Sequence, residues 1–399
     1  MTRVVRGGRG AACCQRGENG AASSTMKRPS QFLRFTILAV TLFVLGLHSP
    51  LGAKEKPARE LPKKQLTASE EEQLDQADIA FEKAYELSTA QHGAEAVTQF
   101  RGGLAELQRL VGPDDARVVK RMSDLAKMLT AHGMHGDAVD EYRAIIAIRE
   151  RLLGFGDNFI TDCRYEITAV LQKQGKIDEA VAEYRAGIAN RSCLHDPKDQ
   201  WTLLFRNELA DTLKAQGKHA EAIQELRIVI PVMEQVLGPA RYETITRRHD
   251  LANMFEEEGK KVEAEKEYRA AFAAVQRVHG SKHGDTFDEW MILAEALERL
   301  GNRTGAVKEY RAALAVQRRI PDSVRKNDYG LWSNLFRMQM ALAECLEAQG
   351  KLKEALTIAK QVDDKGMELP RGGYIGSEDV QKLRERIQEA LKKQQAAGK

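Results

Sequence analysis

The fold is decided by the stretch LADTLKAQGKHAEAIQELR, residues 209–227. Apolar residues recur in it at three- and four-residue spacing before Gly217, and the same spacing resumes after it. This period is typical of amphipathic helices. Glycine ends a helix at little cost because it adopts the left-handed conformation readily. The sequence therefore predicts two helices, over residues 201–216 and 220–237, joined by a tight turn.

The same pattern recurs along the chain every 42 residues. The period is marked by alanines at Ala96, Ala138, Ala180, Ala222, Ala264 and Ala306. Arginines keep the same period at Arg101, Arg143, Arg185, Arg227, Arg269 and Arg311. A seventh copy follows after 49 residues, at Ala355, with its extra residues in the connection 321–329. A fixed period of this length predicts an array in which each unit packs only on its neighbours.

Small residues flank the turn in each unit. The turn glycines are Gly133, Gly175, Gly217, Gly259, Gly301 and Gly350. Seven residues before each lies a small side chain, at Ala126, Thr168, Ala210, Ala252, Ala294 and Ala343. We expect these residues to face the repeating alanines and to let the paired helices approach closely.

The pattern L-A-x-x-L-x-x-Q-G-K-x-x-E-A-x-x-E-Y-R-x-x-L resembles the tetratricopeptide repeat, and more narrowly its longer, kinesin light chain type. That type closes its second helix with L-G-x-x-x-x-x-T, which Leu237 to Thr244 and His279 to Thr286 fit. The resemblance covers about residues 69–365. It implies an all-α, right-handed superhelical solenoid of about seven helix-turn-helix repeats with a C-terminal capping helix. The segments lack the four strands and the Trp-Asp signature of propeller blades.

The two ends of the array are predicted separately. Ser69 and Glu72 indicate a capping box near its start, after a linker over 54–68. A loop over 366–376 precedes a terminal helix and tail over 377–399. The apolar face of that helix comprises Val380, Leu383, Ile387 and Leu391. Its charged face comprises Lys382, Arg384, Glu385, Arg386 and Lys392.

The N-terminal segment is typical of export. We expect residues 1–25 to remain unfolded, or to be untranslated if synthesis starts at Met26. Residues 26–53 have the layout of a secretory signal peptide, with Lys27 and Arg28 before the apolar run 35–47 and small residues up to Ala53. The chain is therefore expected to be periplasmic or extracellular. The alternative is an uncleaved signal anchor, which would bring residues 35–53 into a membrane.

The composition fits this division. The 399 residues are 43% hydrophobic, 30% charged and 6% aromatic, with a net charge of +3. Residues 1–53 hold seven Lys and Arg against one acid, so the remainder is mildly acidic. No nucleic-acid partner is therefore expected. Cys163, Cys193 and Cys345 follow the signal segment and form no CxxC pair, so we interpret them as small buried residues.

The resemblance also implies where a partner binds, because the first helix of each pair lines the inner, concave surface in this family. The residues predicted to contact a partner are Asp124, Lys127, Tyr165, Glu166, Asn207, Glu208, Asp211, His249, Asp250 and Asn253. One position is acidic in four consecutive repeats, at Asp124, Glu166, Glu208 and Asp250. Farther along, Ile292 and Ala341 beside Met291 and Met340 could dock an apolar anchor.

Two interpretations of the four acids stay open. In the sharper one they form a ladder that binds a basic or amide-rich extended peptide. In the other they belong to a solvated face that is neutralised by Lys127, Arg164, Arg206 and Arg248. Kinesin-type repeats commonly carry asparagine at the two positions before L-A, where only Asn207 matches well here.

The sequence favours no catalytic or metal chemistry. Motifs such as G-x-S-x-G, the P-loop and H-E-x-x-H do not occur in it. The pairs His132 with His135, and His279 with His283, supply two ligands each without a third partner at telling spacing, so no metal and no cofactor is expected.

The predicted function is therefore that of a non-catalytic scaffold or adaptor that binds a protein or peptide. A membrane-anchored assembly factor of an envelope complex is the first alternative. An enzyme with a site at the 320–332 insertion, which holds Asp322, Asp328 and Tyr329, is the second.

Overall fold

The computed structural model describes residues 60–90, 92–154, 157–192, 198–320, 329–362, 367–368, 374–375 and 377–397. The predicted regions 1–25 and 26–53, together with Cys193, Asp322 and Asp328, lie outside these residues. Cys163 and Cys345 are buried free thiols, as predicted. No helix in the described part of the chain combines the length and the apolar character that crossing a bilayer requires.

The described residues form an all-α helical repeat solenoid, as predicted, with seven helix pairs and a terminal helix. The first helices are α2 Ala68–Thr89, α4 Ala116–Ala131, α6 Asn158–Lys173, α8 Gln200–Ala215, α10 Tyr242–Glu257, α12 Gly284–Arg299 and α15 Tyr329–Ala348. The second helices are α3 Gly93–Val111, α5 His135–Leu153, α7 Ile177–Ser192, α9 His219–Val236, α11 Lys261–His279, α13 Arg303–Gln317 and α16 Leu352–Gln361. The terminal helix is α17 Ser377–Ala397.

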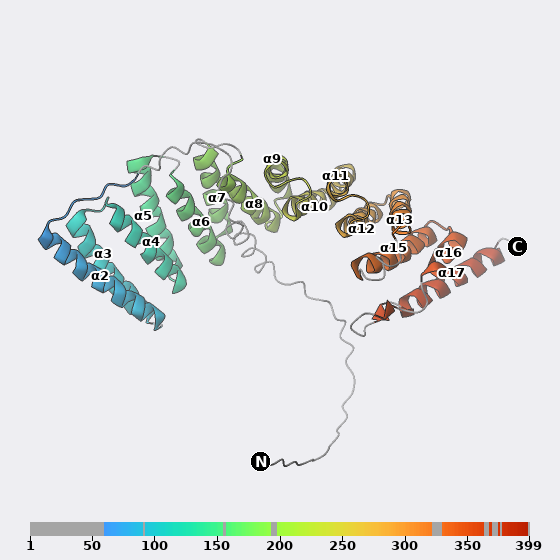
Figure 1. Cartoon of the computed structure of the whole chain (residues 1–399), viewed down its shortest axis with the longest axis horizontal. Helices are drawn as coiled ribbons and strands as arrows, with labels where there is room; N and C mark the ends of the chain where they lie inside the picture. Colours follow the sequence, from blue (N-terminus) through green and yellow to red (C-terminus); the bar gives the residue numbers. More distant parts are fainter. Residues whose placement is uncertain are drawn as a thin grey trace, which may run out of the picture. The chain divides into compact units, whose positions relative to one another are not determined.

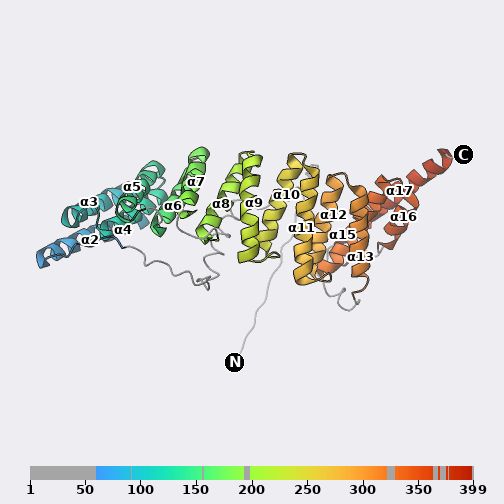
Figure 2. The ribbon, with the colours of Figure 1, turned by 90° about the horizontal axis from the view of Figure 1, so that it is seen from above.

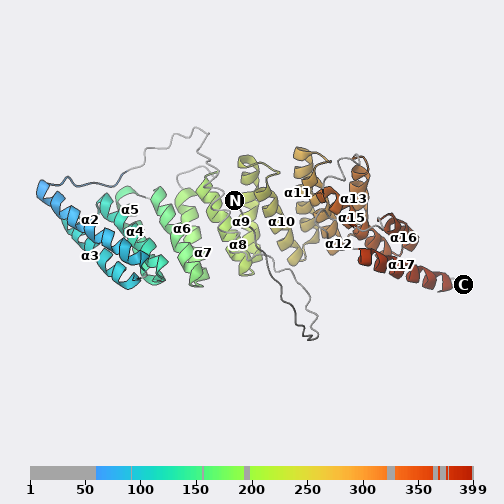
Figure 3. The ribbon, with the colours of Figure 1, turned by 60° about the horizontal axis from the view of Figure 1, so that its bottom comes forward.

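Each helix packs on the helices next to it in the chain (Figure 1). The helices also follow one another in chain order when the ribbon is turned (Figures 2 and 3). Contacts are therefore local in sequence, as expected for a repeat array in which each unit buries its apolar face against its neighbours.

The turn glycines have the conformation that the sequence predicts. Gly217 between α8 and α9 has φ 72°, and the φ angles of the other five predicted turn glycines are also positive. A Cβ atom at Gly217 would meet nothing within 4 Å, so backbone conformation and not space requires glycine there. A second set with positive φ, Gly112, Gly154, Gly238 and Gly280, ends the second helices.

The small residues lie where the helices of a pair meet. Ala126, Ala210, Ala252, Ala294 and Ala343 are buried, and so are the repeating alanines from Ala96 to Ala355. The aromatic residue that follows in the second helix is also buried, as Tyr142, Tyr184, Tyr268 and Tyr310. The tyrosine hydroxyls of three repeats contact polar residues of the preceding first helix, as in the hydrogen bond of 2.8 Å from Tyr310 to Glu298.

The start of the array differs from its prediction in two details. The capping box consists of Thr67 and Glu70, not Ser69 and Glu72: Thr67 accepts from the Glu70 amide and its own amide donates to the Glu70 carboxylate at 2.9 Å. The segment predicted as a linker is held in place from Leu61 onwards, because Leu61 is buried and the Lys64 amide donates to Asp115 at 2.7 Å.

The end of the array also differs in two details. The loop predicted over 366–376 contains a two-stranded antiparallel pair, β1 Met367–Glu368 and β2 Tyr374–Ile375. The predicted apolar face of α17 is buried at Val380, Leu383 and Ile387. Arg384, however, is not on an outer charged face.

Arg384 is buried, and it donates to the backbone carbonyls of Ala359 at 2.9 Å and Val362 at 2.8 Å. The last carbonyls of a helix lack partners within that helix, so a long cationic side chain from α17 satisfies those at the end of α16.

Candidate functional site

The candidate site is the set of polar side chains that the first helices α4, α6, α8 and α10 contribute at equivalent positions. We call it the first-helix stripe, and it consists of Asp124, Lys127, Tyr165, Glu166, Asn207, Glu208, Asp211, His249, Asp250 and Asn253. Lys127 is exposed, Asn207 and Glu208 are buried, and the remaining members are partly buried. The stripe is therefore more desolvated than a freely solvated face would be.

The arginines that were predicted to neutralise the acidic ladder contact other groups. Each pairs with a glutamate of the second helix in its own repeat, 19 residues on. The pairs are Arg164 with Glu183, Arg206 with Glu225 and Arg248 with Glu267, with N–O distances of 2.7, 2.5 and 2.5 Å. The prediction that these three arginines neutralise the ladder is therefore wrong, because their side chains reach across to the second helix of the pair.

Two acids of the ladder, Asp124 and Asp250, lie beside cations other than these arginines. Asp124 lies 3.8 Å from Arg121 of the same helix, whose guanidinium also binds Asp78 of α2 at 2.7 Å. Asp250 accepts from Lys214 of α8 at 2.7 Å and lies 3.3 Å from Arg247.

Arg247 links two consecutive repeats. It is buried in α10 and donates to Asp211 of α8 at 2.9 Å, besides its contact with Asp250. A guanidinium with five fixed donors suits this bridging role. The C-terminal part of the stripe is therefore a fixed ion network.

Glu166 and Glu208, in the middle of the ladder, are different. Among the described residues, neither carboxylate accepts a hydrogen bond or forms an ion pair. Glu208 is 8% exposed, and its burial, together with the nearby negative charge of Asp211, raises the pKa of its carboxyl group to about 7. Arg247 opposes this rise only in part. A carboxyl group in this state would gain from a cation placed beside it.

Tyr165 and Asn207 flank these two acids. The Tyr165 ring lies 6.2 Å from the Trp201 ring and 6.3 Å from the Phe205 ring, measured between centroids. Burial raises the pKa of the Tyr165 hydroxyl, and the negative charges of Glu208 and Glu166 raise it further. Asn207 donates to the Leu203 carbonyl at 2.9 Å, while its own side-chain oxygen is buried without a partner.

The remaining C-terminal members are held by their neighbours. His249 lies 3.0 Å from Glu289 of α12, and Asn253 accepts from the Tyr268 hydroxyl. The apolar docking surface predicted farther along is smaller than expected, because Met291 is buried in the core. Ile292 and Ala341 are partly buried.

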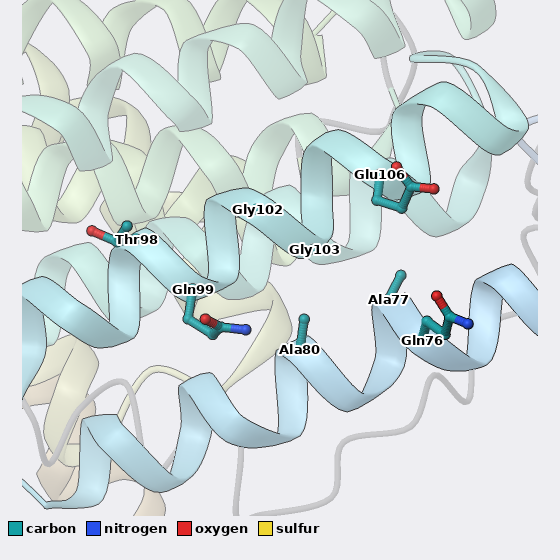
Figure 4. Close-up of a pocket in the computed structure, with 8 residues that line it drawn as sticks. All are labelled: Gln76, Ala77, Ala80, Thr98, Gln99, Gly102, Gly103 and Glu106. Atoms are coloured by element: carbon teal, nitrogen blue, oxygen red, sulfur yellow. The ribbon is translucent and has the colours of Figure 1, made fainter.

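A shallow hollow of about 280 Å³ lies outside the stripe, between α2 and α3 (Figure 4). Small residues line it: a Cβ atom at Gly102 would meet nothing within 4 Å, whereas at Gly103 it would lie 3.1 Å from Ala80 and 3.2 Å from the Ala77 carbonyl. Gln76, Gln99 and Glu106 supply its polar atoms, but nothing in it resembles a reactive centre.

Sequence reasoning missed one group of side chains. His279 and His283 were judged to lack a third metal ligand, yet Asp285 lies beside both, and the ligand atoms of the three residues all fall within 4.8 Å of one another. The signal was H-x-x-x-H-x-D, which becomes a cluster only because the glycine turn between α11 and α12 brings the three side chains together.

Comparison with known proteins gives the class of the fold. The family model described as tetratricopeptide repeat matches residues 201–277. This stretch therefore consists of tetratricopeptide repeats, which confirms the resemblance predicted from the sequence. No curated protein has a sequence that matches the chain.

Solved structures with similar helix arrays include kinesin light chain-like proteins. A Podosopora anserina protein described as a kinesin light chain with nearly identical repeats is 22% identical over 50% of this chain and 91% of its own, with a TM-score of 0.37. BtubC (BKLC) of P. vanneervenii is 15% identical over 64% and 94%, with a TM-score of 0.37. A tetratricopeptide repeat protein of Parabacteroides merdae is 11% identical over 78% and 98%, with a TM-score of 0.35.

Tetratricopeptide repeats generally mediate protein–protein interaction and typically act as scaffolds without catalysis.

Proposed function

We propose that this protein is a non-catalytic scaffold whose first-helix stripe binds an extended, basic segment of a protein partner. The observation that carries the proposal is the pair Glu166 and Glu208, two carboxylates of consecutive repeats that form no ion pair and accept no hydrogen bond among the described residues. The arginines of the same helices bind glutamates of the second helices instead.

The chemistry of the stripe selects the partner. A Lys or Arg side chain that docks beside Glu208 gains a charge-assisted hydrogen bond in a desolvated place, where such a bond is worth more than in water. Tyr165 offers an aromatic face to the same cation, and the free Asn207 oxygen offers an acceptor to a peptide amide. An acidic segment would meet repulsion from both carboxylates.

The test uses Glu166→Gln with Glu208→Gln, which keep the size of the side chains and remove their charge. Asp250 is left intact because its replacement would remove the ion-pair partner of Lys214 and one of the two carboxylates that Arg247 contacts. The control is Asp140→Asn with Glu263→Gln, which makes the same change of charge at exposed positions of the second helices α5 and α11.

Binding is measured by fluorescence anisotropy against labelled twelve-residue peptides, with lysine- and arginine-rich sequences compared with glutamate-rich ones. We expect the wild type and the control to bind the basic peptides, and the stripe variant to bind them at least about tenfold more weakly. Binding at pH 6 should also release a proton, because a bound cation lowers the pKa of Glu208. Equal affinity of the two double variants would refute the role of the stripe.

We also propose that the protein is exported, with residues 26–53 acting as its signal peptide. Lys27, Arg28, the apolar run 35–47 and Ala53 support this. N-terminal Edman sequencing of the protein purified from its native host tests it. A mature start near Lys54 is expected, whereas a retained residue 26 would indicate the signal anchor and the alternative role in an envelope assembly.

A further inference from the structure

We propose that the turn between α11 and α12 binds a single divalent transition-metal ion of the Zn²⁺ class through His279, His283 and Asp285. This site lies outside the first-helix stripe and does not depend on the proposed function. His279 is the last residue of α11, His283 is the N-cap of α12, and Asp285 lies in the first turn of α12. A bound ion would therefore join two consecutive repeats.

The geometry suits a tetrahedral ion. The Oδ2 atom of Asp285 lies 3.2 Å from Nδ1 of His279 and 3.5 Å from Nδ1 of His283. Ligands at the usual Zn–N and Zn–O distances of about 2.0–2.1 Å stand about 3.3 Å apart in a tetrahedron. Two edges of the ligand triangle therefore already have the required length.

The repeat itself does not require these histidines. At the positions equivalent to His279, three other turns carry the apolar residues Val111, Leu153 and Leu237, and a fourth carries His195. At the positions equivalent to His283, three other turns carry an aspartate, Asp115, Asp157 and Asp199, which is the N-cap of the following helix. Both histidines thus replace residues that serve packing or capping elsewhere in the chain.

As an N-cap, His283 is a weak substitute for those aspartates. Its Nδ1 atom accepts from the Asp285 amide at 3.3 Å, longer than the 2.9 Å from Asp115 to the Arg117 amide. A metal ion would replace this long hydrogen bond at small cost.

The donor set decides which ions fit. Two imidazoles and one carboxylate suit Zn²⁺, Ni²⁺ and Cu²⁺, whereas Mg²⁺ and Ca²⁺ prefer oxygen ligands. All three residues are exposed, so water can complete the coordination sphere.

The experiment is a Zn²⁺ titration of the full chain, produced without a histidine tag and stripped of metal, followed by calorimetry. Two variants remove ligands: His279→Leu, which installs the residue found at Leu237, and Asp285→Asn. The control is His219→Gln, which disrupts an isolated histidine–carboxylate pair, His219 with Glu257 at 3.4 Å.

We expect one Zn²⁺ per wild-type chain and the same affinity in the His219→Gln control. His279→Leu and Asp285→Asn should each weaken binding at least about tenfold. The Co²⁺-loaded wild type should show the visible absorption of a tetrahedral centre, and both ligand variants should lose it. Equal unfolding midpoints of the metal-free proteins would show that the variants are folded.

Three results would overturn the site: no stoichiometric binding by the wild type, unchanged affinity in His279→Leu, or equal competition by Mg²⁺. A loss of affinity in the His219→Gln control as large as that in the ligand variants would also overturn it, because the ion would then bind surface histidines in general.

Discussion

Glu208 should make the stability of this protein fall as the pH rises from about 4.5 to 7. Glu208 lies in α8 and is 8% exposed, and the pKa of its carboxyl group rises from an ordinary value of 4.5 to about 7. The native state therefore holds the proton more tightly than the unfolded chain does. The stabilisation is complete below pH 4.5 and is lost as the pH rises through the pKa of the folded state.

The magnitude follows from the two pKa values. A change from 4.5 to about 7 corresponds to about 3 kcal/mol between the fully protonated and fully ionised limits. Between pH 5 and pH 8, about 2.5 kcal/mol of this free energy should be lost. Glutamine cannot ionise, so Glu208→Gln should be free of this loss.

The assay is urea unfolding of the wild type and Glu208→Gln, followed by circular dichroism at pH 5 and pH 8. The stability of the variant relative to the wild type should be higher at pH 8 than at pH 5, by about 2 to 3 kcal/mol. Any constant effect of the amide cancels in this difference. A difference close to zero, or of opposite sign, would refute the argument that burial and Asp211 raise the pKa of Glu208.

Four further substitutions test the packing of the helices along the array. Arg247→Met should cost about 2 to 4 kcal/mol in urea unfolding, because Asp211 would lose its buried cation; an unchanged midpoint would contradict this. Gly217→Ala should cost about 1 to 2 kcal/mol because its φ is 72°, whereas Gly136→Ala inside α5 should be neutral or stabilising by up to about 1 kcal/mol. Arg384→Met should accelerate amide hydrogen exchange in α17, where unchanged protection would show that its bonds to α16 are dispensable.

The helix pairs could be predicted because each depends on requirements that recur in every unit. A glycine must reverse the chain, and a small residue must lie where two helices touch, as at Gly217 and Ala210. These constraints are local and steric, so they are visible in the residues themselves. The helices over 200–215 and 219–236 begin and end within one residue of their predicted bounds.

The errors arise where several local solutions satisfy the same pattern. Thr67 with Glu70, and Ser69 with Glu72, both fit the capping-box spacing, and only the packed chain selects the first. Arg384 was assigned to the charged face of α17, but the end of α16 offers it carbonyl acceptors that no sequence pattern reveals.

The partners of Arg164, Arg206 and Arg248 were unpredictable for the same reason. Arg164 could reach Glu166 nearby in its own helix or Glu183 in the next, and the closeness of α6 and α7 decides for the second. Side-chain direction across a helix pair is a property of packing, which sequence spacing alone does not give.

The charge pattern explains why the stripe, and not another surface, carries the proposed function. Glutamates of the second helices bind arginines of their own repeat and of neighbouring repeats. Glu183 accepts from Arg164 of its own repeat at 2.7 Å and from Arg143 of the preceding repeat at 3.5 Å. Such charges hold the array together and cannot change without loosening it. Glu166 and Glu208 are not part of this network, so a charged partner can use them without breaking a contact between repeats.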